Sequence, residues 1–167
     1  PSLVVFRESA AEARIHGRDF GTALAKVEEF RAAGGDKNAY HVMRAYIYHR
    51  LGRQPEVIGE LDQMSSEPMA TLSYVIIGYH DYLRCKLGER DRVEEEIKGV
   101  ESEPVRALRN RYCAAGVGDL DAIFESFQRT MDTGRNIYYA TGVYDEASLD
   151  PRWRAVVDYM HWPTDHL

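Results

Sequence analysis

A short stretch of this sequence occurs twice at one spacing, and that duplication constrains the fold more than any other feature. Leu51-Gly52-Arg53 is followed by Ser66-Glu67-Pro68. The same pattern returns 36 residues later, where Leu87-Gly88-Glu89 is followed by Ser102-Glu103-Pro104. Internal periods of about 20–50 residues mark arrays of stacked supersecondary units. We therefore expect a repeat protein in which each unit packs on its neighbours.

The repeated unit is predicted to be a pair of helices. Apolar residues recur at helical spacing nearly everywhere, and no segment keeps the two-residue alternation of a strand. Turn glycines separate the helical stretches at spacings of 35, 36 and 30 residues; they are Gly17, Gly52, Gly88 and Gly118. Two short amphipathic helices with their turns need about 34 residues. The pattern predicts helix, turn, helix, repeated four times.

Capping residues support these helix boundaries. Asp19 and Asp36 stand where N-caps are needed, and Pro55 fits the first turn of a helix that begins near Gln54. Ser66 and Ser102 each precede Glu-Pro, which is a coherent helix start signal. We expect one all-α domain over residues 1–167, with repeats near 3–34, 37–68, 69–103 and 104–133 and a C-terminal cap over 134–162.

This unit is similar to the tetratricopeptide repeat, which has a small residue and an aromatic in its first helix, a glycine at the turn, and apolar core positions in its second helix. The second unit matches best, through Ala45, Tyr48, Gly52, Val57, Leu61 and Pro68. The other units match in part, through Ala10, Gly17, Phe20, Ala23 and Val27, then Gly88, Val93, Ile97 and Pro104, then Gly118-Asp119-Leu120. Over residues 3–132 the resemblance implies an α-α superhelix of about four helical hairpins. Asp81 and Arg111 depart from it, because they stand where a small residue is expected.

The tail carries a second resemblance. Asp150-Pro151-Arg152-Trp153 is similar to the Asp-Pro-Arg-Phe segment that often closes tetratricopeptide arrays in bacterial signalling proteins. In such proteins the array accompanies a nucleotide-cyclase, kinase or winged-helix domain, so the resemblance implies a bacterial, cytoplasmic setting. Independently, Trp153, Val156, Val157 and Met160 form an apolar stripe. We expect a terminal helix that covers the last repeat.

Bulk composition narrows the function classes. The net charge is −6, from 21 basic and 27 acidic residues, which argues against a nucleic-acid binder without excluding a local basic patch. No stretch approaches the ~20 apolar residues of a membrane span. Leu3-Val4-Val5-Phe6 is too short for the apolar core of a signal peptide. The chain begins with Pro1 rather than Met, which leaves open that it is part of a longer protein.

The residues that usually carry chemistry form no convincing constellation. Cys85 and Cys113 are too few for a disulfide framework, and we expect two reduced thiols on helices. His161 and His166 are a poor metal site because they lie in the tail, and no other histidine has zinc-ligand spacing. Gly116-Val117-Gly118 follows a helix rather than a strand, and Glu94-Glu95-Glu96 is typical of a solvated helix face. We predict no enzyme activity, no cofactor and no metal.

A set of tyrosines and cations is the best candidate for a binding surface. In the repeat register, Tyr46, Tyr82 and Tyr112 fall at similar places on the first helices of three units, which line the concave groove in tetratricopeptide folds. Tyrosine combines a large apolar face with a hydroxyl, as good interface anchors do. Flanking cations could pair with a carboxylate, and they are Arg50, Lys86 and Arg109. The alternative is that these tyrosines are ordinary packing between helices, since aromatics at helical spacing are usually core.

The sequence favours a protein–protein interaction module of a bacterial signalling protein. The Lys and Asn positions of carboxylate-clamp repeats are not evident, so binding of chaperone tails is not supported. Two alternatives stay open. The array could sense a small molecule or peptide and pass that to an effector domain, or it could dimerise its parent protein.

Overall fold

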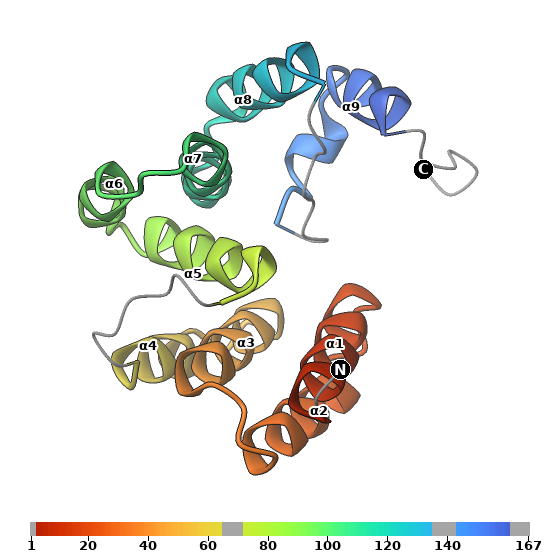
Figure 1. The fold of residues 1–167 in the computed structure, drawn as a ribbon, viewed down its shortest axis with the longest axis vertical. Helices are drawn as coiled ribbons and strands as arrows, with labels where there is room; N and C mark the ends of the chain where they lie inside the picture. The colour runs from red at the N-terminus through yellow and green to blue at the C-terminus, as the bar shows by residue number, and fades with distance from the viewer. Residues whose placement is uncertain (1–2, 65–71, 135–142, 161–167) are drawn as a thin grey trace. The chain divides into compact units, whose positions relative to one another are not determined.

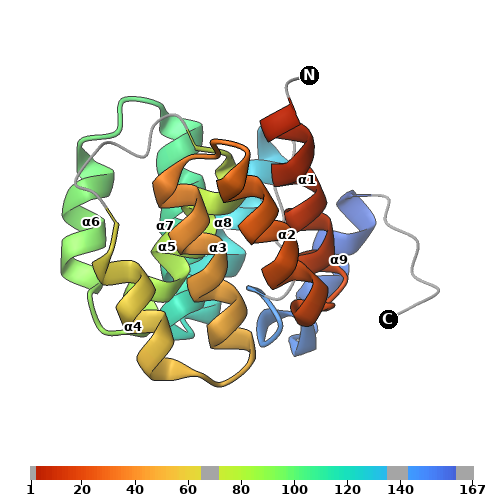
Figure 2. The same cartoon turned by 90° about the horizontal axis from the view of Figure 1, so that it is seen from below.

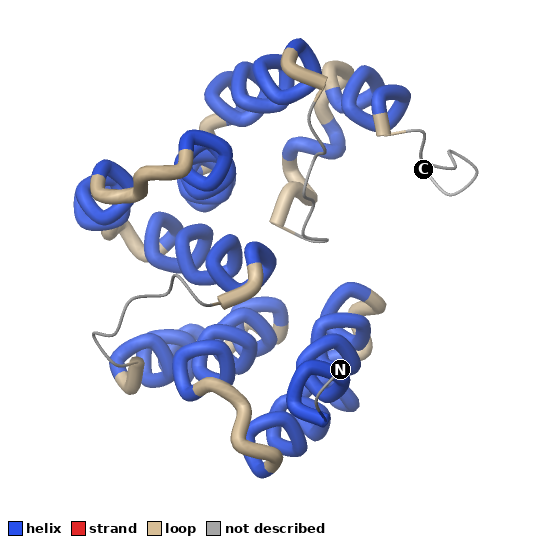
Figure 3. Tube along the Cα trace, in the orientation of Figure 1, coloured by secondary structure: helices blue, strands red, loops and turns tan. Residues whose placement is uncertain are grey.

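The computed structural model describes residues 3–64, 72–134 and 143–160, and in these ranges all regular secondary structure is helical (Figure 3). The all-α fold class is therefore confirmed. In chain order the helices are α1 (Leu3–His16), α2 (Phe20–Ala32), α3 (Lys37–Arg50), α4 (Gln54–Asp62), α5 (Tyr74–Lys86), α6 (Arg90–Lys98), α7 (Glu103–Val117), α8 (Leu120–Asp132), the short 3-10 helix η2 (Ala147–Leu149) and α9 (Trp153–Tyr159). Among them none combines the length and the apolar character that a bilayer crossing requires.

The chain divides into two compact units, Pro1–His80 and Asp81–Leu167. In the first unit, α1 packs on α2, α2 on α3, and α3 on α4 (Figure 1). Helix α3 contacts helices on two sides, and this explains why its apolar residues are buried around most of its circumference. Its most deeply buried side chains include Val42, Met43, Ala45 and Ile47.

In the second unit, α6 packs on α7 and α7 on α8, and α9 contacts both α8 and η2. Figure 2 shows these helices from below. The predicted terminal stripe is largely confirmed, because Trp153, Val156 and Val157 of α9 are buried. The helix begins at Trp153. Asp150 caps the turn before it, where its side chain accepts a bond from the backbone N–H of Arg152 at 2.9 Å. The tail histidines His161 and His166 lie outside the described residues.

The turns inside the hairpins share one backbone feature. Gly52, Gly88 and Gly118 each follow a first helix and adopt positive φ, at 72°, 88° and 75°. In the first hairpin the equivalent residue is Arg18, with φ of 57°, and not Gly17 as predicted. The left-handed residues thus lie 34, 36 and 30 residues apart. A non-glycine residue in this conformation costs about 1–2 kcal/mol.

The predicted helix starts are mostly confirmed. Asp19 and Asp36 accept bonds from the backbone N–H groups of Thr22 and Ala39, as N-caps do. Ser102 occupies the N-cap position of α7, but its side chain makes no capping bond. Ser66-Glu67-Pro68 lies outside the described residues, and the described part of the next helix begins at Tyr74.

The two cysteines are bonded to one another, so the expectation of reduced thiols is wrong. Cys85 of α5 and Cys113 of α7 form a disulfide with a Cα–Cα distance of 5.2 Å. Both cysteines are buried, and they form one apolar cluster with Val93 and Ile97 of α6. Spacing along the sequence could not reveal this bond, because it depends on α5 and α7 lying side by side.

Candidate functional site

The six predicted groove residues are on the first helices α3, α5 and α7. Tyr46 and Arg50 belong to the first unit, and the remaining four belong to the second. Each group is therefore described within its own unit.

In the first unit, Tyr46 is part of an aromatic stack. Its ring lies 3.9 Å from the ring of Tyr79, nearly parallel to it, and both rings are almost fully buried. Burial, together with the neighbouring Tyr46 and Glu12, raises the pKa of Tyr79. Arg50 is half-buried, donates to the Tyr46 hydroxyl at 3.4 Å, and lies over the ring of Phe20 at 5.9 Å. This arrangement fixes α3 against α2 and α5.

In the second unit, the predicted tyrosines are also interior. Tyr82 is buried, whereas Lys86, one turn further along α5, is exposed. The Lys86 ammonium lies 5.6 Å from the Tyr82 ring centroid. Tyr112 has no exposed surface, and its ring lies 5.5 Å from that of Tyr144. These rings can stabilise the unit but do not offer a face to a partner.

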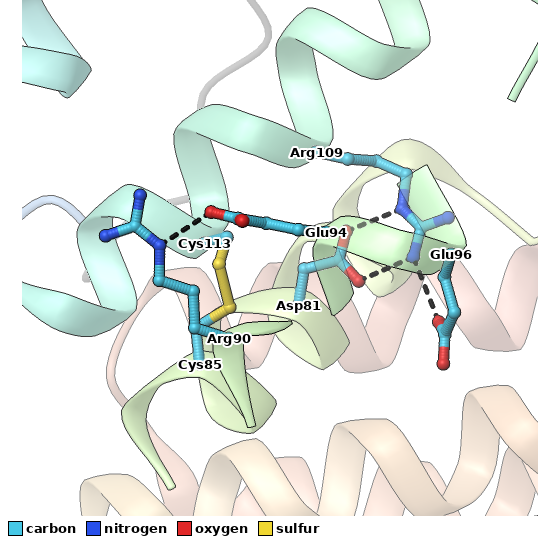
Figure 4. Close-up of a disulfide and its surroundings, with 7 residues drawn as sticks. All are labelled: Asp81, Cys85, Arg90, Glu94, Glu96, Arg109 and Cys113. Carbon is cyan, nitrogen blue, oxygen red and sulfur yellow. Dashed lines mark hydrogen bonds and ion pairs between the residues drawn. A yellow bond between two sulfur atoms is a disulfide. The ribbon is translucent and has the colours of Figure 1, made fainter. Parts of the chain in front are cut away.

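Arg109 is the centre of a buried ion pair (Figure 4). Its Nε and Nη2 donate to the two carboxylate oxygens of Asp81 at 2.7 and 2.9 Å, and Nη2 also reaches Glu96 at 3.4 Å. Asp81 has no exposed surface, and Arg109 is 8% exposed. Burial lowers the pKa of Arg109, but its bonds to Asp81 and the acidic charges around it outweigh this, and the pKa is raised. A guanidinium held in this way is not available to a carboxylate from outside.

The three tyrosines are thus interior, as in the alternative of ordinary packing between helices, and Arg109 is bonded to Asp81. Lys86 is exposed and Arg50 half-buried, so these two cations are the predicted site residues that retain solvent contact. Asp81, which breaks the repeat pattern, has a clear explanation, because its charge is matched by Arg109.

A polar cluster between α3 and α4 was not predicted from the sequence. Glu60 of α4 is buried, and its two oxygens contact His41 Nδ1 at 2.8 Å and Arg44 Nε at 2.8 Å. Arg44 also donates to Glu28 and to the hydroxyls of Tyr40 and Tyr48. The signal in the sequence is weak: His41 and Arg44 are three apart on one helix, and their partner lies on the next.

This cluster has the form of a structural network. A carboxylate that contacts a histidine nitrogen can orient the ring for proton transfer, but that chemistry also needs a nucleophile or substrate site next to the other nitrogen. Glu60 is shared with Arg44, which holds two helices together. Burial lowers the pKa of Arg44, yet its bond and attraction to Glu60 dominate and raise it. We assign the cluster to the α3–α4 contact.

The described residues contain no group of three side chains that could hold a metal ion. Helix α6 carries a charged outer surface, where Arg90 bonds to Glu94 at 2.6 Å (Figure 4) and Lys98 to Glu95 at 2.7 Å. These exposed pairs agree with the solvated face predicted for Glu94-Glu95-Glu96. Comparison of the chain with known protein families, curated proteins and solved structures finds no match.

Proposed function

We propose that the chain is a protein-binding module built from stacked tetratricopeptide-like helical hairpins. The observation that carries this proposal is the common turn. Four first helices, α1, α3, α5 and α7, are each followed by a left-handed residue and then a second helix. The bonds that close these turns are also alike: the residue after the left-handed one donates to a carbonyl five residues earlier, as Arg53 does to Tyr48 and Glu89 to Arg84. Repeated local geometry is the signature of repeat architectures.

A second observation supports side-by-side stacking of first helices. The Asp81–Arg109 ion pair and the Cys85–Cys113 disulfide both join α5 to α7 at an offset of 28 residues. Two links at one offset, a helical turn apart, require the two helices to run parallel. Arrays of this kind bind partners along the surface formed by successive repeats.

An exposed cation of the second unit gives this proposal its chemistry. Among the predicted site residues of that unit, Lys86 is exposed and carries a positive charge. It suits an acidic segment or a terminal carboxylate of a protein partner. The buried Tyr82 and Tyr112 then act indirectly, since they stabilise the unit that presents this cation.

A charge reversal at Lys86 tests this function. Affinity capture with the wild type and Lys86→Glu, read by quantitative mass spectrometry, should give partners that the variant loses at least tenfold. Lys98→Glu is the matched control, because it reverses an exposed lysine of the same unit on α6. Equal capture by all three proteins would contradict the proposal. A Tyr46→Ala/Tyr82→Ala variant is unsuitable, since both rings are buried and their loss would destabilise the fold.

The bacterial signalling context and the cytoplasmic location remain proposals from the sequence. The disulfide counts against the second of them, because such bonds persist in oxidising compartments and are rare in the cytosol. Ligand sensing is a second candidate function, and one buried cation of the second unit, Arg111, favours it.

A further inference from the structure

Arg111 of α7 is a buried cation, and no described residue neutralises its charge. It is 3% exposed. Neither Nε nor Nη1 has a hydrogen-bond partner, and the guanidinium makes no ion pair with any residue of the described ranges. Its described contact is with the ring of Phe127 on α8, whose centroid lies 4.4 Å from the guanidinium carbon. An aromatic face attracts a cation, but it accepts none of the five N–H bonds that arginine can donate.

The other buried charges of this protein show how unusual Arg111 is. Arg109 is bonded to Asp81, and Arg84 to Glu89 at 3.0 Å. Glu60 is shared between His41 and Arg44. Within the described residues, Arg111 is thus the one buried formal charge without an opposite charge beside it. The other buried charges are thus matched by opposite charges, and among the described residues the counter-charge of Arg111 is missing.

Arg111 lies in surroundings where a charge without a counter-charge is energetically unfavourable. Phe127 lies against Tyr144 and Trp153, with ring centroids 5.4 and 5.7 Å away, so the guanidinium borders an aromatic core. A charge in such a medium loses its hydration, and only a counter-charge or strong acceptor restores that loss. The same medium strengthens the attraction once an anion is present.

The register of the repeat adds a further point. Asp81 and Arg111 stand at equivalent places, each seven residues before the left-handed turn glycine, Gly88 or Gly118. In the earlier hairpin, the charge at this place is neutralised from within the chain by Arg109. In the later hairpin, no described residue supplies the neutralising charge.

We propose that Arg111 is the anchor of a binding site for a small oxyanion, such as inorganic phosphate or the carboxylate of a small acid. The planar guanidinium suits both, since its N–H groups form a fork that matches two oxygens of either anion. This site lies wholly in the second unit. It gives the ligand-sensing candidate its class of ligand, and it does not depend on the protein-binding function.

Thermal unfolding of the full chain tests the site. Phosphate and acetate are titrated in separate series, with chloride adjusted to hold ionic strength constant. The melting temperature of the wild type should rise with one of the two anions and then saturate, as expected when a ligand binds only the folded state. The anion that acts identifies whether phosphate or carboxylate is preferred. A wild type that responds to neither anion overturns the proposal.

Two variants show whether Arg111 is responsible. Arg111→Met has similar length and no charge, and it should melt higher than the wild type in chloride and lose the anion response. Arg90→Met, an exposed arginine of the same unit, should keep the wild-type response. An unchanged response in Arg111→Met overturns the assignment. If that variant does not fold, ¹⁵N spectra of wild type decide instead, with the Arg111 Nε–H signal assigned from Arg111→Lys: it should shift on addition of the active anion, and a static signal overturns the proposal.

Discussion

In the second unit, buried and exposed charged pairs differ in what the loss of one member costs. The bidentate contact between Arg109 and Asp81 gives two charge-assisted hydrogen bonds in a region closed to solvent. Such a pair adds little over a well-packed apolar pair, but removal of one member leaves the other charge without compensation. Exposed pairs behave differently, because water screens them and compensates for their loss.

We therefore expect Arg109→Met to destabilise the protein by about 3–5 kcal/mol, because Asp81 would remain buried and charged. Urea unfolding followed by circular dichroism measures this loss. The matched control is Arg90→Met, which breaks the exposed pair with Glu94 and should cost about 1 kcal/mol or less. Similar small losses in both variants would show that the buried pair has no special role.

Helices α5 and α7 approach each other closely at Gly116. A Cβ built there would lie 2.4 Å from the Tyr82 carbonyl oxygen and 3.0 Å from both the Cys85 Cβ and the Lys86 nitrogen. Two of these three atoms belong to the backbone and cannot move without shifting the helix. The disulfide spans the same contact from Cys113, less than one helical turn away. The absence of a side chain at Gly116 allows α5 and α7 to approach closely, and the Cys85–Cys113 bond joins them covalently.

Gly116→Ala should destabilise the protein by about 1–3 kcal/mol, since α5 must move to accommodate the methyl group. Gly59→Ala in α4 is the control, because a Cβ there meets no atom within 4 Å. That change should stabilise the protein by about 0.5–1 kcal/mol through its effect on helix propensity. Denaturant midpoints compare the two, and equal signs for both would refute the close approach.

Reduction of the disulfide should lower the free energy of unfolding by about 3–4 kcal/mol, the amount expected from closing a loop of this length in the unfolded chain. Urea titrations with and without a phosphine reductant measure the change. A Cys85→Ala/Cys113→Ala variant should be insensitive to the reductant. A wild type whose midpoint is unaffected by reduction would mean that the bond is not formed.

The sequence predicted elements better than it predicted contacts between them. Helix starts at Asp19 and Asp36 and the turns at Gly52 and Gly88 follow from local chemistry, and they are found as expected. In the first turn the left-handed residue is Arg18 rather than the predicted Gly17. Its position depends on the hydrogen bonds that close the turn, and the residue type alone does not reveal them.

The candidate site was harder to predict, because burial is decided between helices. Tyr46, Tyr82 and Tyr112 share a register, but nothing in their own segments indicates which face another helix covers. The Cys85–Cys113 bond is equally hidden, since its members are 28 residues apart on separate helices.

At the scale of the whole molecule, the account depends on how the hairpins are arranged. The proposed function needs an open stack, in which successive first helices form one extended surface. The alternative is a closed bundle in which the helices surround a single core, and such a bundle would give a partner no continuous surface of first helices.

Small-angle X-ray scattering of the full chain distinguishes these arrangements most directly. A compact globule of 167 residues has a radius of gyration of about 15 Å. The stacked arrangement predicts a clearly larger value and a pair-distance distribution with an extended tail at long distances. A radius of about 15 Å with a symmetric, bell-shaped distribution would contradict the stack and, with it, the proposed binding module.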